Sequence, residues 1–332
     1  WHLLQKKDLY ILYPELHIDL FKYSPSFAVM FAPFALFPDF LGMIFWNPLN
    51  ALLLFFAVKM IDIDERKKSF IIWFILIELI TSLQNYQSNA LTTSLIIFVF
   101  VLLERKNYLL AGICVAFGFY IKLFGVLSAL LWFLYGGKGK FFLSALISTI
   151  ILFALPLVFV SPSELSVIYK SWFNLLSTDN SHELNHSVMS VMKNWFGLSL
   201  NKIWIQFVGV LLLIVPLIKW NFFQEKQFRL LFLCSILIWA VIFNHKAESA
   251  TYIIAVVGCA IWFFNSEKNV LEESLIIMLF ILTCLSPTDL FPKTIRENYI
   301  VPYSLKAIPC IFIWIKIQYE LLTFRGRTEK MN

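Results

Sequence analysis

Long apolar segments follow one another along the chain, and short polar connections separate them. They fall near residues 40–60, 70–83, 87–104, 108–121, 122–135, 141–160, 203–219, 229–243, 249–264, 274–286 and 302–322. Several are shorter than the roughly 20 residues that an isolated membrane-spanning helix needs. Short spans are tolerated where neighbouring helices or a water-filled cavity satisfy the backbone. The pattern predicts an all-α fold, in which residues 1–332 form one polytopic transmembrane helical bundle of about eleven spans.

Two segments depart from this alternation. The apolar run 26–37 is bracketed by Pro25 and Pro38 and interrupted by Pro33. Because proline ends or kinks a helix, this run is predicted to be a helix that lies at the membrane interface within an outer loop, residues 1–38. The second segment, 161–202, is rich in polar residues and is predicted to be a long outer loop.

Composition supports a membrane protein. The chain is 60% hydrophobic and only 14% charged, whereas soluble domains are about a quarter charged. The net charge of +6 is therefore interpreted as a topology signal and not as a nucleic-acid-binding signal. The five cysteines all lie in apolar runs without a CxxC pattern, which argues against disulfides and zinc sites. The sequence begins with Trp1 in a polar stretch, so we expect a preceding amino-terminal segment.

The distribution of lysine and arginine predicts the orientation. The connections 59–69, 104–107, 136–140, 219–229, 265–274 and 323–332 hold the denser set of basic residues, which marks the cytoplasmic side. The amino-terminal loop, the turn "QNYQSN", the segment 161–202 and the stretch "NHKAESATY" then share the outer side. We therefore expect a multi-pass protein of the plasma (inner) membrane with an extracytoplasmic site.

Cations and an aromatic residue on this side are candidate ligands for a lipid phosphate. Lys22 and Tyr23 belong to "FKYSP", where a proline fixes the entry into the membrane. Lys122 interrupts a long apolar run, and an ammonium there is costly unless it faces a cavity or a partner. The alternatives are an interfacial aromatic and lysine belt for the first pair, and snorkelling to the interface for Lys122.

Neutral amides provide a second kind of candidate ligand. Gln84, Gln87 and Asn89 lie in "SLQNYQSNALTTS" between two apolar runs. Amides both donate and accept hydrogen bonds, so they can bind sugar hydroxyls on several edges. The alternative interpretation is a helix cap and turn, positions that Asn and Ser favour.

The segment 182–186, "HELNH", matches the zinc-protease pattern H-E-x-x-H letter by letter. In zinc proteases that pattern lies on a long buried helix and is joined by a third ligand. Here it follows "STDN" in a polar loop, and no third ligand is evident nearby. We therefore predict no metal site and interpret Asn185 and His186 as substrate-binding residues.

The stretch "NHKAESATY" separates two strongly apolar runs. His245 can exchange a proton near neutral pH. Lys246 can attract a phosphate, and Glu248 can orient the histidine or bind a hydroxyl. The alternative is a solvated turn. We predict that His245 assists catalysis and that Lys246 and Glu248 bind substrate.

Four stretches together resemble glycosyltransferase family 87, a family of membrane enzymes with the C-type glycosyltransferase fold. They are "LYPELHIDLFKYSPSFAVMFAPFALFP", "WNPLNALLLF", "QNYQSNALTTSLII" and "ERKNYLLAGICVAFGFYIKLFG". The resemblance extends over nearly the whole chain and is strongest in residues 8–135 and 244–264. It implies transfer of a sugar from a polyprenyl-phosphate donor on the outer face, by an inverting displacement without a metal or other cofactor.

The resemblance also implies a carboxylate base in the first outer loop, at a position that falls at or before Trp1. Asp8, Glu15 and Asp19 do not match that position, so none of them is assigned the role. His245 corresponds to a histidine of the family that serves the active site. Weaker correspondences support Lys22, Gln84, Gln87, Asn89, Lys122 and Asn185.

The expected function is transfer of a hexose or pentose, with mannose as the first candidate, to a lipid or glycan acceptor. The expected partners are the polyprenyl-phosphate sugar, the acceptor and the membrane, and no nucleic acid. Two other classes stay open. A lipid-sugar transporter or flippase would favour inverted repeats, which are not evident. A non-catalytic membrane assembly subunit would bind lipid sugars without transferring them.

Overall fold

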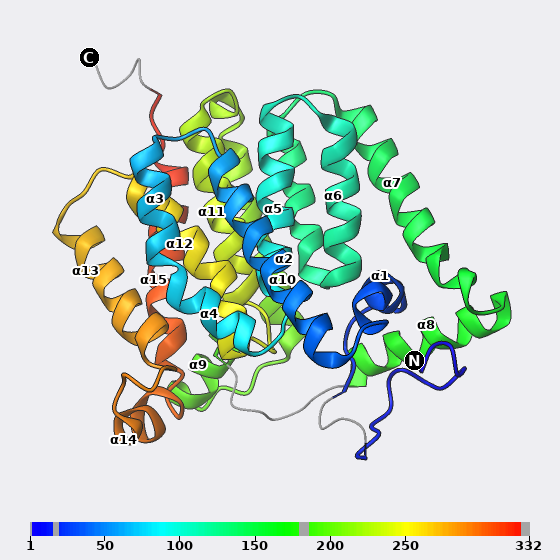
Figure 1. The fold of residues 1–332 in the computed structure, drawn as a ribbon. Coiled ribbons are helices and arrows are strands. Elements are labelled where there is room, and N and C mark those ends of the chain that lie inside the picture. The colour runs from blue at the N-terminus through cyan, green and yellow to red at the C-terminus, as the bar shows by residue number, and fades with distance from the viewer. Residues whose placement is uncertain (1, 16–19, 179–185, 327–332) are drawn as a thin grey trace.

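The computed structural model describes residues 2–15, 20–178 and 186–326, and the regular elements in these ranges are helices (Figure 1). This confirms the all-α prediction. The α-helices are α1 (Pro25–Ala35), α2 (Asp39–Met60), α3 (Glu65–Phe74), α4 (Leu76–Gln84), α5 (Asn89–Glu104), α6 (Tyr108–Ile121), α7 (Lys138–Ala154), α8 (Pro162–Thr178), α9 (Val188–Phe196), α10 (Lys202–Ile214), α11 (Lys226–Ile242), α12 (Ile253–Asn265), α13 (Val270–Leu279), α14 (Lys293–Ile295) and α15 (Ile308–Leu322).

Shorter or tighter helical segments extend several of these helices. The 3-10 segments are Leu123–Leu134, Leu155–Val158, Val215–Ile218, Trp220–Phe222, Ser249–Tyr252 and Leu305–Ala307, and the π-helical segments are Phe280–Leu285 and Arg296–Ile300. Helix α1 covers most of the run predicted to be an interfacial helix. It begins where the Ser24 side chain accepts a hydrogen bond from the Phe27 amide at 3.1 Å, and Pro25 occupies its first turn.

The number of membrane spans differs from the prediction. Among the described residues, two helices are long and apolar enough to cross a membrane: Asp39–Met60 and Lys138–Val158. A third span results if the segments Lys293–Ile300 and Leu305–Leu322, which meet at 85°, are taken as one. Each of the predicted apolar runs does lie in a helical segment. Many of these helices are short, however, so the count of about eleven spans is not confirmed.

The helices differ in what covers their apolar residues. Helices α11 and α12 lie in the interior, and their side chains are buried almost all the way round. In contrast, α2, α7 and α10 expose large apolar side chains such as Phe45, Ile150 and Trp204. A helix that is apolar on every side needs a protein interior or lipid around it. The inner pair finds this environment in the protein, and the outer helices need it from the membrane.

The described parts of the segment 161–202 contain more helix than the predicted loop. It contains α8 and α9, and α8 packs Leu165, Ile168, Tyr169 and Trp172 against the bundle. These residues recur at intervals of three or four, as an amphipathic helix requires. Hydrogen bonds join α8 to the amino-terminal region, including Tyr169 with Ser26 at 2.8 Å. Helix α8 therefore covers part of the described amino-terminal region, which comprises residues 8–15 and 20–26.

The connections between helices gather at two ends of the bundle (Figure 1). The upper end in Figure 1 holds the connections that follow α2, α5, α10 and α12, together with the end of α15. The amino-terminal region, the connection 85–88, α8, α9 and the connection 243–252 lie at the lower end. Segments that are far apart in the sequence can therefore build one site at the lower end.

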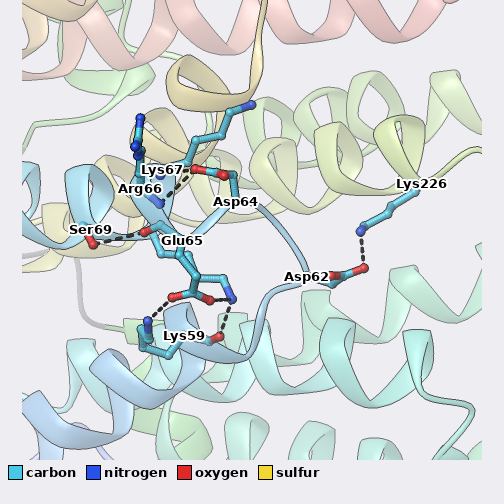
Figure 2. A network of polar contacts seen from close by, with 9 residues as sticks. Lys59, Asp62, Asp64, Glu65, Arg66, Lys67, Ser69 and Lys226 are labelled. Carbon is cyan, nitrogen blue, oxygen red and sulfur yellow. Dashed lines mark hydrogen bonds and ion pairs between the residues drawn. The ribbon is translucent and has the colours of Figure 1, made fainter.

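A dense network of paired charges occupies the upper end (Figure 2). Asp64 caps α3 by accepting from the Arg66 amide at 2.9 Å. Glu65 pairs with Lys59 and with Lys68, the latter at 2.7 Å, and Asp62 pairs with Lys226. This network joins the ends of α2, α3 and α11.

Candidate active site

A cavity of about 250 Å³ opens among the connections at the lower end of the bundle. Its walls come from residues 20–24, the break between α6 and the 3-10 segment Leu123–Leu134, the second half of α8, and the connection 244–251. Seven residues that the sequence predicts to be functional line it: Lys22, Tyr23, Gln87, Lys122, His245, Lys246 and Glu248.

Lys122 reaches the cavity because the helix breaks at this residue. Its backbone is extended (φ −145°, ψ 127°), which ends α6 and starts the 3-10 segment in the opposite direction. The two segments touch where Gly125 packs on Gly118: a Cβ atom at Gly125 would meet the Gly118 carbonyl oxygen at 2.4 Å. The close contact holds Lys122 at the tip of a tight helical hairpin.

The ammonium of Lys122 starts a chain of hydrogen bonds. It donates to Asn89 Oδ1 at 2.5 Å. Asn89 Nδ2 donates to Gln87 Oε1 at 2.6 Å and to the Ala250 carbonyl oxygen at 2.8 Å. Gln87 Nε2 in turn donates to Glu248 Oε2 at 2.6 Å. Two amides thus connect a cation to a carboxylate across one wall of the cavity, and each amide has a fixed orientation.

Aromatic and apolar groups complete the wall beside the cations. Lys122 Nζ lies 5.8 Å from the ring centroids of both Tyr23 and Phe124, within the range of a cation–π interaction. Trp172 on α8 donates from Nε1 to the Lys22 carbonyl oxygen at 3.2 Å. Helix α8 therefore holds Lys22 at the rim, and its Leu175 and Leu176 add an apolar surface.

The connection 244–252 is held by its own backbone and by His186. Asn244 accepts from the Lys246 amide at 3.0 Å, and Glu248 accepts through its carbonyl oxygen from the Thr251 amide at 3.0 Å. The His186 amide donates to the Ala247 carbonyl oxygen at 3.0 Å. His186 thus supports this connection from behind and is not among the residues that line the cavity.

Burial keeps both histidines neutral at physiological pH. Burial, and next the positive charge of Lys202, lower the pKa of His245 to about 4. Burial, and next Lys306, lower the pKa of His186 to about 4. A neutral His245 at the cavity wall can accept a proton or a hydrogen bond from a bound hydroxyl.

One further predicted residue lies outside the cavity, and another is not among the described residues. Gln84 is exposed at the end of α4 and is not among the residues that line the cavity. It was selected as an amide in a polar turn and by a weaker correspondence with the family, and neither signal shows whether its side chain faces the cavity. Asn185 lies outside the described residues, as do His182 and Glu183 of the "HELNH" pattern, so their roles stay predictions.

The sequence analysis did not select Trp172, Leu175 or Thr251, which also line the cavity. The helical spacing of apolar residues in 162–178 could have identified α8 and its inward face. No comparable signal marks Thr251, because its position depends on how the connection folds.

Comparison with known families identifies the family of this chain. The sequence model of glycosyltransferase family 87 matches residues 21–287. The chain belongs to this family. It is therefore a glycosyltransferase, and its apolar helices place it among membrane proteins. No curated protein matches the sequence. The family 87 match includes every segment that lines the cavity except Leu20.

Proposed function

We propose that this family 87 glycosyltransferase transfers a hexose or pentose, with mannose as the first candidate, from a polyprenyl-phosphate sugar to a lipid or glycan acceptor. The cavity would face the extracytoplasmic side of the plasma membrane. The proposal is carried by one observation: among the described residues that line the cavity, Lys22, Lys122 and Lys246 accompany a single carboxylate, that of Glu248. Such an excess of cations suits a phosphate.

The cations serve the leaving group. In the proposed reaction an acceptor hydroxyl attacks C1 of the sugar. The bond between C1 and the phosphate oxygen breaks, and its electron pair leaves with the polyprenyl phosphate. Cations placed where this negative charge develops stabilise the transition state. Lys122 is the strongest candidate, because Asn89 and two aromatic rings fix its ammonium at the wall.

The amides and His245 serve the sugar and the acceptor. Gln87 lines the cavity, and Glu248 beside it can accept hydrogen bonds from sugar hydroxyls. The acceptor proton passes to a carboxylate base of the kind that the family resemblance implies. Neutral His245 assists by accepting a hydrogen bond from the acceptor hydroxyl.

The size of the cavity limits what it encloses. Pockets that enclose a drug-sized ligand measure about 300–1,000 Å³. A cavity of about 250 Å³ has room for a sugar phosphate but not for a polyprenyl chain. The lipid chain would therefore stay in the bilayer, along the exposed apolar surface of the outer helices.

Reconstitution of the full-length protein tests the proposal. Proteoliposomes would receive radiolabelled polyprenyl-phosphate mannose and membrane glycolipids, and the label in the acceptor fraction would be measured. Lys122→Gln should reduce transfer by roughly 10²–10³-fold, the effect of removing one donor that stabilises developing negative charge. The control, Lys140→Gln, changes an exposed lysine at the start of α7 and should leave transfer unchanged.

The possible results separate the alternatives. Equal activity of Lys122→Gln and the wild type would contradict the proposed phosphate site. Binding of the donor without any transfer would favour a non-catalytic subunit. Movement of labelled lipid between leaflets without a new glycoside would favour a flippase. A pentose or another hexose as the only active donor would keep the reaction class and correct the sugar.

A further inference from the structure

A fully buried ion pair lies behind the connection 244–252, outside the cavity. Lys306 Nζ and Glu78 Oε1 are 2.7 Å apart, and the side chains are 1% and 0% exposed. Lys306 lies just before α15, and Glu78 lies on α4, so the pair joins segments 228 positions apart. Removing two charges from water is expensive, and such a pair is weak support for stability alone.

The pair contacts the residues that hold the site. Lys306 Nζ lies 5.0 Å from the centroid of the Tyr252 ring. The Tyr252 hydroxyl donates to the His186 carbonyl oxygen at 2.7 Å. The His186 amide donates to the Ala247 carbonyl oxygen at 3.0 Å. A continuous series of contacts therefore leads from Glu78 to the backbone between Lys246 and Glu248.

We propose that Glu78 and Lys306 are positioning residues that fix the connection 244–252 through Tyr252 and His186. The ion pair sets the place of the ammonium, and the ammonium orients the ring of Tyr252. The tyrosine hydroxyl then fixes His186, which holds Ala247. The consequence for catalysis, namely correct placement of His245 and Glu248, rests on the proposed function.

The opposite wall of the connection is held separately. Asn89 donates to the Ala250 carbonyl oxygen, and Gln87 donates to Glu248. The connection is thus clamped between the amide chain from Lys122 and the series of contacts from Glu78. If the contacts on one side are lost, Glu248 and His245 can shift relative to the lysines that line the cavity, while the helix bundle stays folded.

The chain offers a matched control at the other end. Arg229 and Glu104 also form a close ion pair, with Nε and Oε1 2.6 Å apart and exposures of 12% and 21%. Glu104 accepts a further hydrogen bond from Tyr135 at 2.6 Å. Like the first pair it joins distant segments, but it lies at the end of α5 and the start of α11, away from the cavity.

The test compares two double variants of the full-length protein in proteoliposomes. Glu78→Leu with Lys306→Met removes the first pair without leaving a lone buried charge, and Glu104→Leu with Arg229→Met does the same to the second. Hydrogen–deuterium exchange across 244–252 is measured first. It should rise only in the Glu78 and Lys306 variant, because only that pair supports this connection.

Transfer from polyprenyl-phosphate mannose gives the second measurement. We expect kcat of the Glu78 and Lys306 variant to fall on the order of 10- to 100-fold, the effect of a small misplacement of reacting groups. KM for the donor should change little, since the cations remain. A general loss of stability would instead change both double variants alike.

If the double variant does not fold, Tyr252→Phe provides a second test of the positioning role. It removes one hydroxyl and should raise exchange at the His186 and Ala247 amides. Unchanged exchange across 186 and 244–252 in the folded variants overturns the positioning role. Raised exchange with an unchanged kcat overturns its importance for transfer. If the wild type transfers no sugar from any donor tested, the proposed function fails, while the exchange measurement still decides the positioning role.

Discussion

The cavity and the upper end of the helix bundle differ in how their charges are arranged. At the upper end, cations meet carboxylates in close pairs: Glu65 contacts Lys59 and Lys68 (Figure 2), and Glu104 contacts Arg229. At the lower end, three lysines line a cavity whose described walls carry only the carboxylate of Glu248. The described lining of the cavity therefore carries more positive than negative side chains, which suits an anionic ligand.

The burial of charged and titratable side chains also differs between the two ends. The Lys59 and Glu65 side chains are 37% and 65% exposed, so water screens them and their pairs contribute little to stability. At the cavity, burial is strong enough to lower the pKa of His245 to about 4. Electrostatic interactions with a bound phosphate are therefore stronger at the lower end than at the upper end.

The largest expected effect is a difference in accessibility between the ends. Arg66 lies at the upper end and Gln84 at the lower end, and both are exposed, so a cysteine at each position reports on one end. In intact cells an impermeant maleimide should label Gln84→Cys and not Arg66→Cys, and permeabilisation should make both reactive. Four native cysteines are buried and Cys114 is half-buried, so Cys114→Ala provides a suitable background. Labelling of both positions in intact cells would contradict the proposed orientation.

The next largest effect concerns chemistry at the cavity. His245→Ala removes the proposed proton-transfer group and should reduce the rate of sugar transfer by roughly 10²–10⁴-fold. The protein should still insert and fold, which size-exclusion chromatography in detergent can verify. Lys246→Ala is the matched neighbour and should lose less activity if it only attracts the anionic donor. Equal losses in both variants would assign the effect to the connection as a whole and not to His245.

An intermediate effect is expected at the upper end. Arg229→Met removes the ion pair with Glu104. It should lower the free energy of unfolding by about 1.5–3 kcal/mol, the usual contribution of hydrogen bonds to a charged group. Thermal unfolding in detergent would measure this. Transfer per folded molecule should stay constant, because Arg229 does not line the cavity. A loss of kcat at unchanged stability would show that the two ends are coupled.

The smallest expected effect is the response to pH between 6 and 8. Because the folded pKa of His245 is lowered from 6.5 to about 4, the imidazole stays neutral over this range and transfer should not follow its titration. Below pH 6.5 the unfolded chain binds protons that folded His245 and His186 do not, so stability should decrease as the pH falls toward 4. Rates and melting temperatures across pH 4–8 test both statements. A rate step near 6.5 that disappears in His245→Ala would mean that His245 is open to water.

Much of the cavity could be predicted from the sequence because polar residues are rare in this chain. Lys122 interrupts an apolar run, and His245 and Glu248 separate two others, so each of these polar residues suggested a function. The alternation of apolar runs then placed these residues with Lys22 and Gln87 at one end. The structure brings all five to one cavity.

The parts that the sequence did not reveal depend on tertiary packing. Hydropathy cannot distinguish a helix surrounded by protein from one surrounded by lipid, and α11 and α12 are apolar for the first reason. Hydropathy also does not show where a helix ends, and many of the eleven apolar runs form helices of only 10–17 residues, so only two or three helices are long and apolar enough to cross a membrane among the described residues. Glu78 and Lys306 each look like an isolated charge, and nothing local shows that they form a pair.

The contact between Gly118 and Gly125 sets a limit on how the family 87 chain can vary. A methyl group at Gly118 would meet the Gly125 backbone at 3.5 Å, an ordinary contact, whereas one at Gly125 would meet the Gly118 carbonyl oxygen at 2.4 Å. The same hairpin therefore tolerates alanine on one arm and forbids it on the other. Since Lys122 lies at the tip, a wider hairpin would carry the ammonium away from Asn89. The position of this ammonium at the cavity thus depends on the absence of a single methyl group at Gly125.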